Sequence, residues 1–208
     1  HTRFAGKDTF LAGHGYDRVL GLDDWESAGE SRSQISVWGL SDQRLFVRAA
    51  EVIDDLAASA APFNLTILTL ATHEPGGVFP GCSTSDAVAM ATAMKCSMQA
   101  VAGFIAHLQA TGILEDTVVQ VMGDHLKATS EGGFFKDELE RVPNRTIVYR
   151  VWSPDGVSFS RDHADQLSVL ASTLDLLGLE PAQGRAGLGV SFVGPHPLDG
   201  TALTLGEA

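Results

Sequence analysis

The sequence predicts an α/β fold, a mostly parallel sheet flanked by helices on both faces. Apolar, β-prone runs alternate along the chain with segments whose apolar residues recur every three or four positions. One of those runs is almost continuously apolar, which is typical of a strand covered on both faces of a parallel sheet. Strand, helix, strand in this order indicates right-handed crossovers. With 208 residues and no internal repeat, we expect residues 1–208 to belong to one domain.

The first half of the chain predicts two helices and a strand. Residues 42–58 form an amphipathic helix, with these apolar side chains facing inward: Leu45, Phe46, Ala49, Val52, Ile53 and Leu56. Residues 63–70 form a buried strand that ends in the loop 72–77. The next helix begins near Ser85, ends at Gly112 and buries one stripe: Ala87, Ala91, Met94, Met98, Val101, Ile105 and Leu108. The polar, Gly/Ser-rich stretch 23–36 predicts a loop.

The second half repeats this alternation. Residues 117–122 form a second buried strand, and residues 146–152 form a third strand that the turn 153–156 ends. A helix follows at 165–177 and is closed by Gly178. After residue 184 the chain is rich in Gly and Pro, so we expect an irregular tail packed on the sheet.

The charge of the chain excludes one class of function. The net charge is −12, with only 14 Lys and Arg and no basic run, so we expect no nucleic-acid binding. An anionic substrate would need a bound metal or a few placed cations to overcome this field. No apolar stretch approaches the roughly 20 residues that cross a bilayer.

The two cysteines, Cys82 and Cys96, fit two alternatives. They are two reduced thiols of a cytosolic protein or one disulfide in an oxidising compartment. A helix that begins near Ser85 would place Cys96 about 16 Å along its axis. The short link back to Cys82 spans only roughly 10 Å. A disulfide therefore requires that the helix begin later.

Polar residues that follow two of the predicted strands are the candidates for chemistry. His73 follows the first strand, and Asp124 and His125 follow the second, after the small Gly123. Ligands bind outside the carboxyl ends of parallel strands, and a carboxylate beside an imidazole suits a divalent metal such as zinc, manganese or magnesium. The alternative is a turn-capping Asp124 beside partly buried or loop histidines. Two protein ligands do not close a metal site, so others must come from elsewhere.

The sequence assigns no catalytic nucleophile. It contains no Gly-x-Ser-x-Gly elbow and no phosphate-cradling Gly-x-x-x-x-Gly-Lys-Ser/Thr loop. Lys7 alone carries little information, because surface lysines usually have no specific role.

Several segments in order resemble the family that contains lipoteichoic acid synthase and the periplasmic phosphoglycerol transferase of osmoregulated glucans, a sulfatase-like branch of the alkaline phosphatase superfamily. The resemblance extends from about Arg3 to Ser191, and Met122-Gly123-Asp124-His125 is its most specific segment. The remaining matching segments are Arg3-Phe4-Ala5-Gly6-Lys7-Asp8, His14-Gly15-Tyr16-Asp17, Trp38-Gly39-Leu40-Ser41-Asp42, Thr72-His73-Glu74-Pro75, and Arg161 with Leu174-Asp175-Leu176-Leu177-Gly178.

The resemblance implies roles for four residues. Asp124 and His125 match the metal ligands of the family, which usually binds Mn²⁺ or Mg²⁺, with Zn²⁺ also suited to these residue types. His73 matches the histidine that contacts the phosphoglycerol group, and Lys7 stands where the family often has a basic residue for the same task. The family's threonine nucleophile and a further glutamate ligand precede the matching segment. We therefore expect an N-terminally incomplete catalytic domain that is inactive without that missing portion.

The resemblance also implies an activity. A phosphoglycerol group would pass from a phosphatidylglycerol-like lipid to a hydroxyl of a periplasmic glucan or similar acceptor, through a covalent threonine intermediate. This reaction implies an extracytoplasmic enzyme at the periplasmic face of the bacterial inner membrane, with its anchor outside this chain. The alternatives are a sulfatase or phosphodiesterase of the same superfamily, or a non-catalytic remnant that binds a glycan or partner.

Overall fold

The computed structural model describes residues 2, 4–59, 61–82, 86–130, 132–194 and 196. The chain divides into two compact units. Unit 1 combines His1–Ala110 with Lys127–Arg145, and unit 2 combines Thr111–Leu126 with Thr146–Ala208. Arg3 of the family resemblance, the predicted helix start at Ser85 and the tail beyond residue 196 lie outside the described residues.

Unit 1 is helical. Its elements are a 3-10 turn Phe4–Gly6, α1 Lys7–Gly13, α2 Leu22–Ser27, a 3-10 turn Arg32–Gln34, α3 Asp42–Ala57, α4 Ala89–Ala110 and α5 Lys136–Glu140. The prediction of a loop over 23–36 was wrong at its start, where α2 forms. There the Asp24 carboxylate accepts a hydrogen bond from the backbone N–H of Gly21, and Leu22 is buried.

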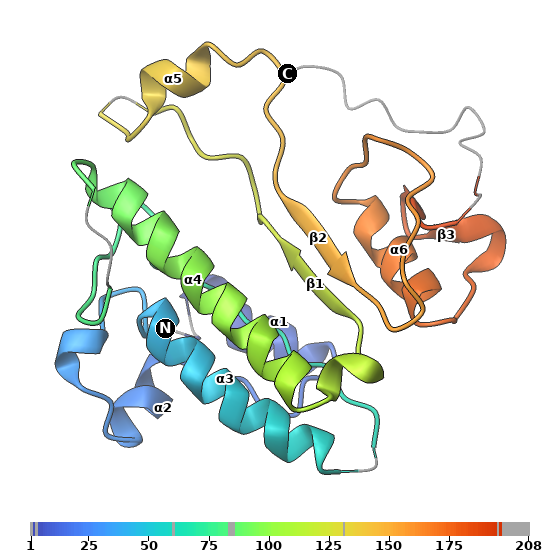
Figure 1. Cartoon of the computed structure of the whole chain (residues 1–208), viewed down its shortest axis with the longest axis horizontal. Coiled ribbons are helices and arrows are strands. Elements are labelled where there is room, and N and C mark those ends of the chain that lie inside the picture. The colour runs from blue at the N-terminus through green and yellow to red at the C-terminus, as the bar shows by residue number, and fades with distance from the viewer. Residues whose placement is uncertain are drawn as a thin grey trace. The chain divides into compact units, whose positions relative to one another are not determined.

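Helices α3 and α4 lie side by side and form the core of unit 1 (Figure 1). The predicted helix at 42–58 is confirmed. Its N-cap is Ser41, whose hydroxyl oxygen accepts from the backbone N–H of Arg44. Phe46 of α3 meets Phe104 of α4 with ring centroids 5.3 Å apart.

The predicted buried stripe of α4 was wrong for two methionines. Met94 is 45% exposed and Met98 is 52% exposed. The buried face of the helix lies about one position away and consists of Met90, Thr92, Ala93, Cys96, Ser97, Phe104 and Leu108. The predicted and the observed buried faces share only Leu108. On a helix this rich in Ala and Met, apolar residues spaced by three and four positions form more than one stripe, so the spacing alone does not identify the buried one.

Cys82 and Cys96 form a disulfide, with Cα atoms 5.7 Å apart. Helix α4 begins at Ala89, so the late start that a disulfide required is observed. The bond joins the segment before α4 to the second turn of the helix.

The predicted strand at 63–70 is not a strand among the described residues. Burial nevertheless alternates along it: Phe63, Leu65, Ile67 and Thr69 are half-buried, whereas the residues between them are exposed. Its end is held by a side chain instead of a neighbouring strand. One carboxyl oxygen of Asp42 accepts from the backbone N–H groups of Leu70 and Ala71, at 2.8 and 3.1 Å.

Unit 2 contains the strands. Its elements are a 3-10 turn Ile113–Glu115, β1 Val119–Met122, β2 Tyr149–Trp152, α6 Ser168–Leu176, a 3-10 turn Ala182–Gly184, β3 Arg185–Ala186 and β4 Gly189–Val190. The predicted strands at 117–122 and 146–152 are confirmed with shorter bounds. They pair with each other in antiparallel register, Val119 opposite Trp152 and Met122 opposite Tyr149. The pairings among the described residues are thus antiparallel, so the parallel pairing predicted from the apolar run of residues 117–122 is wrong for these strands. An apolar run indicates that a strand is covered but does not determine the direction of its neighbour.

Helix α6 confirms the prediction at 165–177 and anchors the last strands. The helix begins at Ser168, whose backbone N–H donates to the Asp165 carboxylate at 2.9 Å, and Gly178, with φ +70°, follows its end. The region after residue 184 is more regular than predicted, because β3 and β4 form a small hairpin that packs on α6. At Gly189 a Cβ atom would lie 2.0 Å from the carbonyl oxygen of Leu167, so this contact requires glycine.

Within the part of the chain that the structure describes, no helix has the length and apolar character needed to cross a bilayer.

Candidate metal and substrate site

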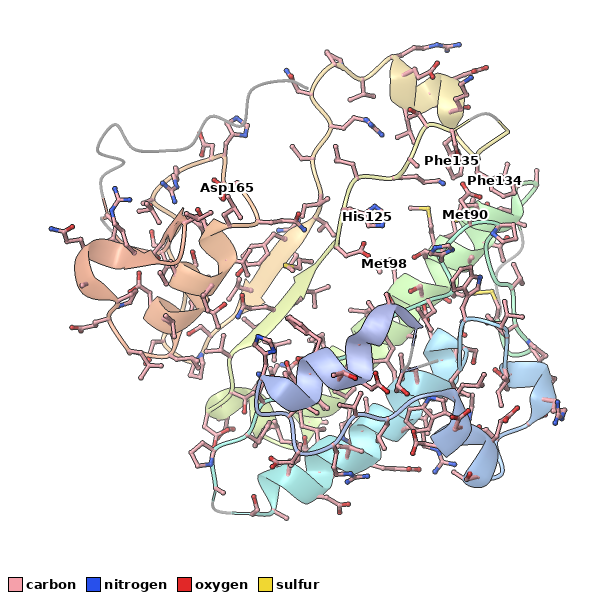
Figure 2. All side chains as sticks on the ribbon, turned by 180° about the vertical axis from the view of Figure 1, so that it is seen from behind. Met90, Met98, His125, Phe134, Phe135 and Asp165 are labelled. Atoms are coloured by element: carbon pink, nitrogen blue, oxygen red, sulfur yellow. A yellow bond between two sulfur atoms is a disulfide. The ribbon has the colours of Figure 1, made fainter. Side chains whose placement is uncertain are left out.

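Asp124 and His125 follow the end of β1 at Met122, and Figure 2 labels His125 there. Both side chains are exposed, at 72% and 70%, and they face each other: Asp124 Oδ2 lies 3.5 Å from His125 Nε2. The other oxygen, Oδ1, accepts from the backbone N–H of His125 at 3.0 Å. The pair is therefore held in one orientation by its own backbone.

These two side chains fit a divalent metal. Two ligand atoms about 2.1 Å from a tetrahedral ion lie about 3.4 Å apart, close to the observed separation of 3.5 Å. His125 Nδ1 lies 2.8 Å from the carbonyl oxygen of Leu126, to which it can donate, which leaves the Nε2 lone pair for a metal. No group of three or more His, Cys, Asp or Glu side chains within the described ranges could hold a metal by itself. A metal bound here needs further ligands.

Gln166 supports the pair from a distant part of unit 2. Its side-chain amide donates to the backbone carbonyl oxygen of Asp124, 42 residues earlier. This bond fixes the turn that follows β1. Sequence analysis missed Gln166, because one glutamine before a helix gives no signal of its own.

His73 lies in unit 1, in the loop that follows residues 63–70. The peptide bond between Glu74 and Pro75 is cis, and Gly76 N–H donates to the His73 carbonyl oxygen at 2.7 Å. His73 Nδ1 lies 2.8 Å from the carbonyl oxygen of Glu74, and the imidazole stacks on Trp38 with centroids 4.2 Å apart. When Nδ1 donates to that carbonyl, Nε2 is left to meet a ligand.

An ion pair holds the loop beside His73. Glu74 accepts from the ammonium of Lys127 and from the backbone N–H of Phe134 at 3.3 Å. The Lys127 hydrogen bond holds the pKa of the Glu74 carboxyl below its ordinary value, so this group stays ionised. Arg145 Nη1 in turn donates to the Lys127 carbonyl oxygen at 2.6 Å. Sequence analysis did not single out Lys127 or Arg145, since only the fold brings them to Glu74.

Lys7 is the first residue of α1 in unit 1 and is exposed. Gly6, with φ +70°, precedes it in a tight turn. The four predicted site residues therefore divide between the units: Asp124 and His125 come together in unit 2, and His73 and Lys7 belong to unit 1.

A cavity of about 200 Å³ opens beside His73 in unit 1. Its walls are mostly apolar and come from the turn 36–40 and the loop 70–79. Trp38 and Phe79 line it, and Leu40 and Ala71 belong to the buried core. Two close approaches shape the walls: a Cβ at Gly39 would lie 2.8 Å from Leu70, and one at Gly77 would lie 2.6 Å from Phe79.

Comparison with known proteins supports the resemblance. The family model described as Sulfatase matches residues 1–179. Phosphoglycerol transferase I of Xanthomonas axonopodis pv. citri (strain 306) is 28% identical over 204 residues, which cover 91% of this chain and 28% of the relative. Phosphoglycerol transferase I of Escherichia coli (strain 55989 / EAEC) is 28% identical over 218 residues, which cover 99% of this chain and 27% of the relative. The chain thus spans just over a quarter of these relatives.

A solved structure confirms the fold class. A protein in the alkaline phosphatase superfamily from Vibrio parahaemolyticus superposes with a TM-score of 0.52 at 24% identity, covering 60% of this chain and 30% of that one. The predicted α/β class and the resemblance to the sulfatase family are both confirmed. The chain belongs to the sulfatase family.

Proposed function

We propose that this chain forms part of a metal-dependent phosphoglycerol transferase. In this reaction a threonine oxygen attacks the phosphorus of a phosphatidylglycerol-like lipid, diacylglycerol leaves with the proton of the threonine hydroxyl, and the phosphoglycerol group becomes bound to threonine. A hydroxyl of a periplasmic glucan or similar acceptor then attacks the same phosphorus, and the threonine oxygen leaves and regains a proton. The threonine is not assigned in this chain. The similarity to two proteins named phosphoglycerol transferase I supports this proposal.

The observation that carries the proposal is the geometry of Asp124 and His125. Their facing Oδ2 and Nε2 atoms, 3.5 Å apart, and the Leu126 carbonyl oxygen behind Nδ1 make two ordered ligands for Mn²⁺, Mg²⁺ or Zn²⁺. Such an ion, when bound, activates an attacking oxygen and neutralises charge on the phosphoryl group. The net charge of −12 makes a local cation necessary for an anionic substrate.

The residues of this chain would orient the donor. In this proposal His73 Nε2 meets a free oxygen of the phosphoglycerol group, with the ring held by Trp38 and by the Glu74 carbonyl oxygen. Lys7 supplies a second positive charge to the same group. The Glu74–Lys127 ion pair keeps the His73 loop in place while the substrate binds.

The same proposal places the protein outside the cytoplasm, at the periplasmic face of the inner membrane. The Cys82–Cys96 disulfide supports this location, because structural disulfides persist in oxidising compartments.

The metal assignment can be tested directly by NMR. Titration of the chain with Mn²⁺ should broaden the imidazole signals of His125 before those of the other six histidines. Asp124→Ala should remove this preference, whereas Asp155→Ala, a change at another exposed aspartate of unit 2, should leave it intact. Equal broadening of all histidines in the unmodified chain would refute the metal assignment.

The donor separates this proposal from its alternatives. In the full-length protein, Asp124→Ala should abolish transfer from a lipid phosphoglycerol donor. Turnover of an aryl sulfate in place of that donor would favour a sulfatase, and the Sulfatase family match keeps this alternative open. Absence of turnover with either substrate, together with no metal preference at His125, would favour a non-catalytic binding domain.

A further inference from the structure

The cavity beside His73 has walls suited to hydrocarbon. Trp38, Leu40, Leu70 and Phe79 line it, and Val37, at its edge, is 78% exposed. A single exposed valine is ordinary. Here, however, the exposed valine adjoins an apolar cavity, so an apolar ligand would cover both.

The same walls exclude the polar ligands of the proposed reaction. No Lys or Arg lines the cavity within the described residues, so a phosphate would find no counter-charge there. The Ser36 hydroxyl donates to the Gly39 carbonyl oxygen at 3.3 Å and accepts from the Trp38 N–H at 3.1 Å. A sugar ring would therefore lose hydrogen bonds to water without replacing them, which is unfavourable.

The position of His73 links this cavity to the proposed donor. His73 lines the cavity, and its Nδ1 can donate to the Glu74 carbonyl oxygen, so Nε2 is the ring atom left for the donor. An imidazole that carries a proton on both nitrogens donates from Nε2 to a phosphate oxygen. In a phosphatidylglycerol-like lipid, the phosphodiester continues into an acylated glycerol. The next part of the donor after the phosphate is thus apolar, as the cavity is.

We propose that this cavity binds the first carbons of one acyl chain of the lipid donor, while His73 binds the phosphate beside it. The inference rests on the proposed function and adds a subsite to it. A cavity of 150 Å³ accommodates benzene, so about 200 Å³ accommodates roughly six to eight carbons. The rest of the chain would extend past Val37.

The length of the acyl chain provides the test. Binding of monomeric 1-acyl phosphatidylglycerols with two to ten acyl carbons is measured by calorimetry on the whole chain, with glycerol phosphate as the unacylated reference. Affinity should rise about fourfold per methylene and level off near six to eight carbons. Val37→Ser should weaken the longer members roughly three- to tenfold and leave glycerol phosphate unchanged. Val47→Ser, at a 45% exposed valine of α3, is the matched control and should have no effect.

The outcomes separate the subsite from the reaction. His73→Gln should weaken every member of the series by the same factor and leave the dependence on chain length intact. Affinity that depends on His73 but not on chain length would overturn the acyl subsite and leave the phosphoglycerol proposal standing. A dependence on chain length that is unchanged by Val37→Ser, or binding that is indifferent to His73, would also overturn the assignment of this cavity to the donor.

Discussion

Replacing Asp42 with Ala should destabilise unit 1 and loosen the loop that carries His73. The carboxyl group of Asp42 is fully buried and accepts three hydrogen bonds: from the backbone N–H groups of Leu70 and Ala71, and from the Ser97 hydroxyl at 2.6 Å. Alanine would leave three buried donors without partners. Each costs about 1–3 kcal/mol, and partial relaxation brings the expected loss to roughly 3–6 kcal/mol. That is a large part of the total stability of an ordinary domain, about 5–15 kcal/mol.

Two further variants separate hydrogen bonding from other effects. Asp42→Asn keeps one oxygen for Leu70 and Ala71, and its amide can donate to the Ser97 hydroxyl oxygen, so the loss should be about 1 kcal/mol. Asp55→Ala removes an exposed aspartate from the same helix and should change stability by less than about 0.5 kcal/mol.

Urea unfolding followed by circular dichroism measures the free energies, and amide hydrogen exchange reports on the two bonds themselves. In Asp42→Ala, exchange at Leu70 and Ala71 should accelerate more than exchange at the centre of α4. A loss below about 1 kcal/mol with protection retained at both amides would refute the view that this carboxyl group holds the end of the 63–70 segment.

Two more interactions of unit 1 allow quantitative tests. Reduction of the Cys82–Cys96 disulfide, which closes a loop of 14 residues, should lower the unfolding free energy by about 3 kcal/mol, measured in urea with and without reductant. An unchanged midpoint would show that the bond adds no stability. Hydrogen bonds from Arg44 and Arg48 lower the pKa of Glu30 below its ordinary value of 4.5. The stability that ionised Glu30 contributes is therefore fully present above about pH 4.5 and is lost as the pH falls through the lower pKa of the folded protein. Glu30→Gln should therefore lose less stability on acidification than the unmodified chain.

Amphipathic helices were the most predictable elements. The spacing of its apolar positions indicated α3, whose N-cap Ser41 the structure adds, and Gly178 indicated the end of α6. In both cases residues close in sequence determine the boundary, because caps act within a few residues of the helix end.

Which face a helix buries was less predictable. Met94 and Met98 fit an apolar stripe as well as Met90 does, and the buried side depends on the distant α3 and on the disulfide at Cys96. Likewise, residues 63–70 have the composition of a strand but pair with a side chain, Asp42, 28 residues earlier. The preference of a residue for strands reflects how well its side chain fits a half-buried surface, and it does not determine which segment the chain pairs with.

The site was predicted where neighbours in sequence are neighbours in space. Asp124 and His125 follow each other at the end of β1, so their mutual approach needed only a correct strand prediction. Lys127 and Gln166 were missed because their partners, Glu74 and Asp124, are 53 and 42 residues away. The metal-binding role of Asp124 and His125 and the roles proposed for His73 and Lys7 remain predictions.

The discontinuity of unit 1 has a consequence for biosynthesis. Glu74 is made 53 residues before Lys127, and unit 1 is completed only when Arg145 has been added. At bacterial elongation rates, the 35 residues between Ala110 and Arg145 take roughly two to seven seconds to translate. Until Lys127 has been added, the Glu74 carboxylate lacks the ammonium from which it accepts a hydrogen bond in the complete unit.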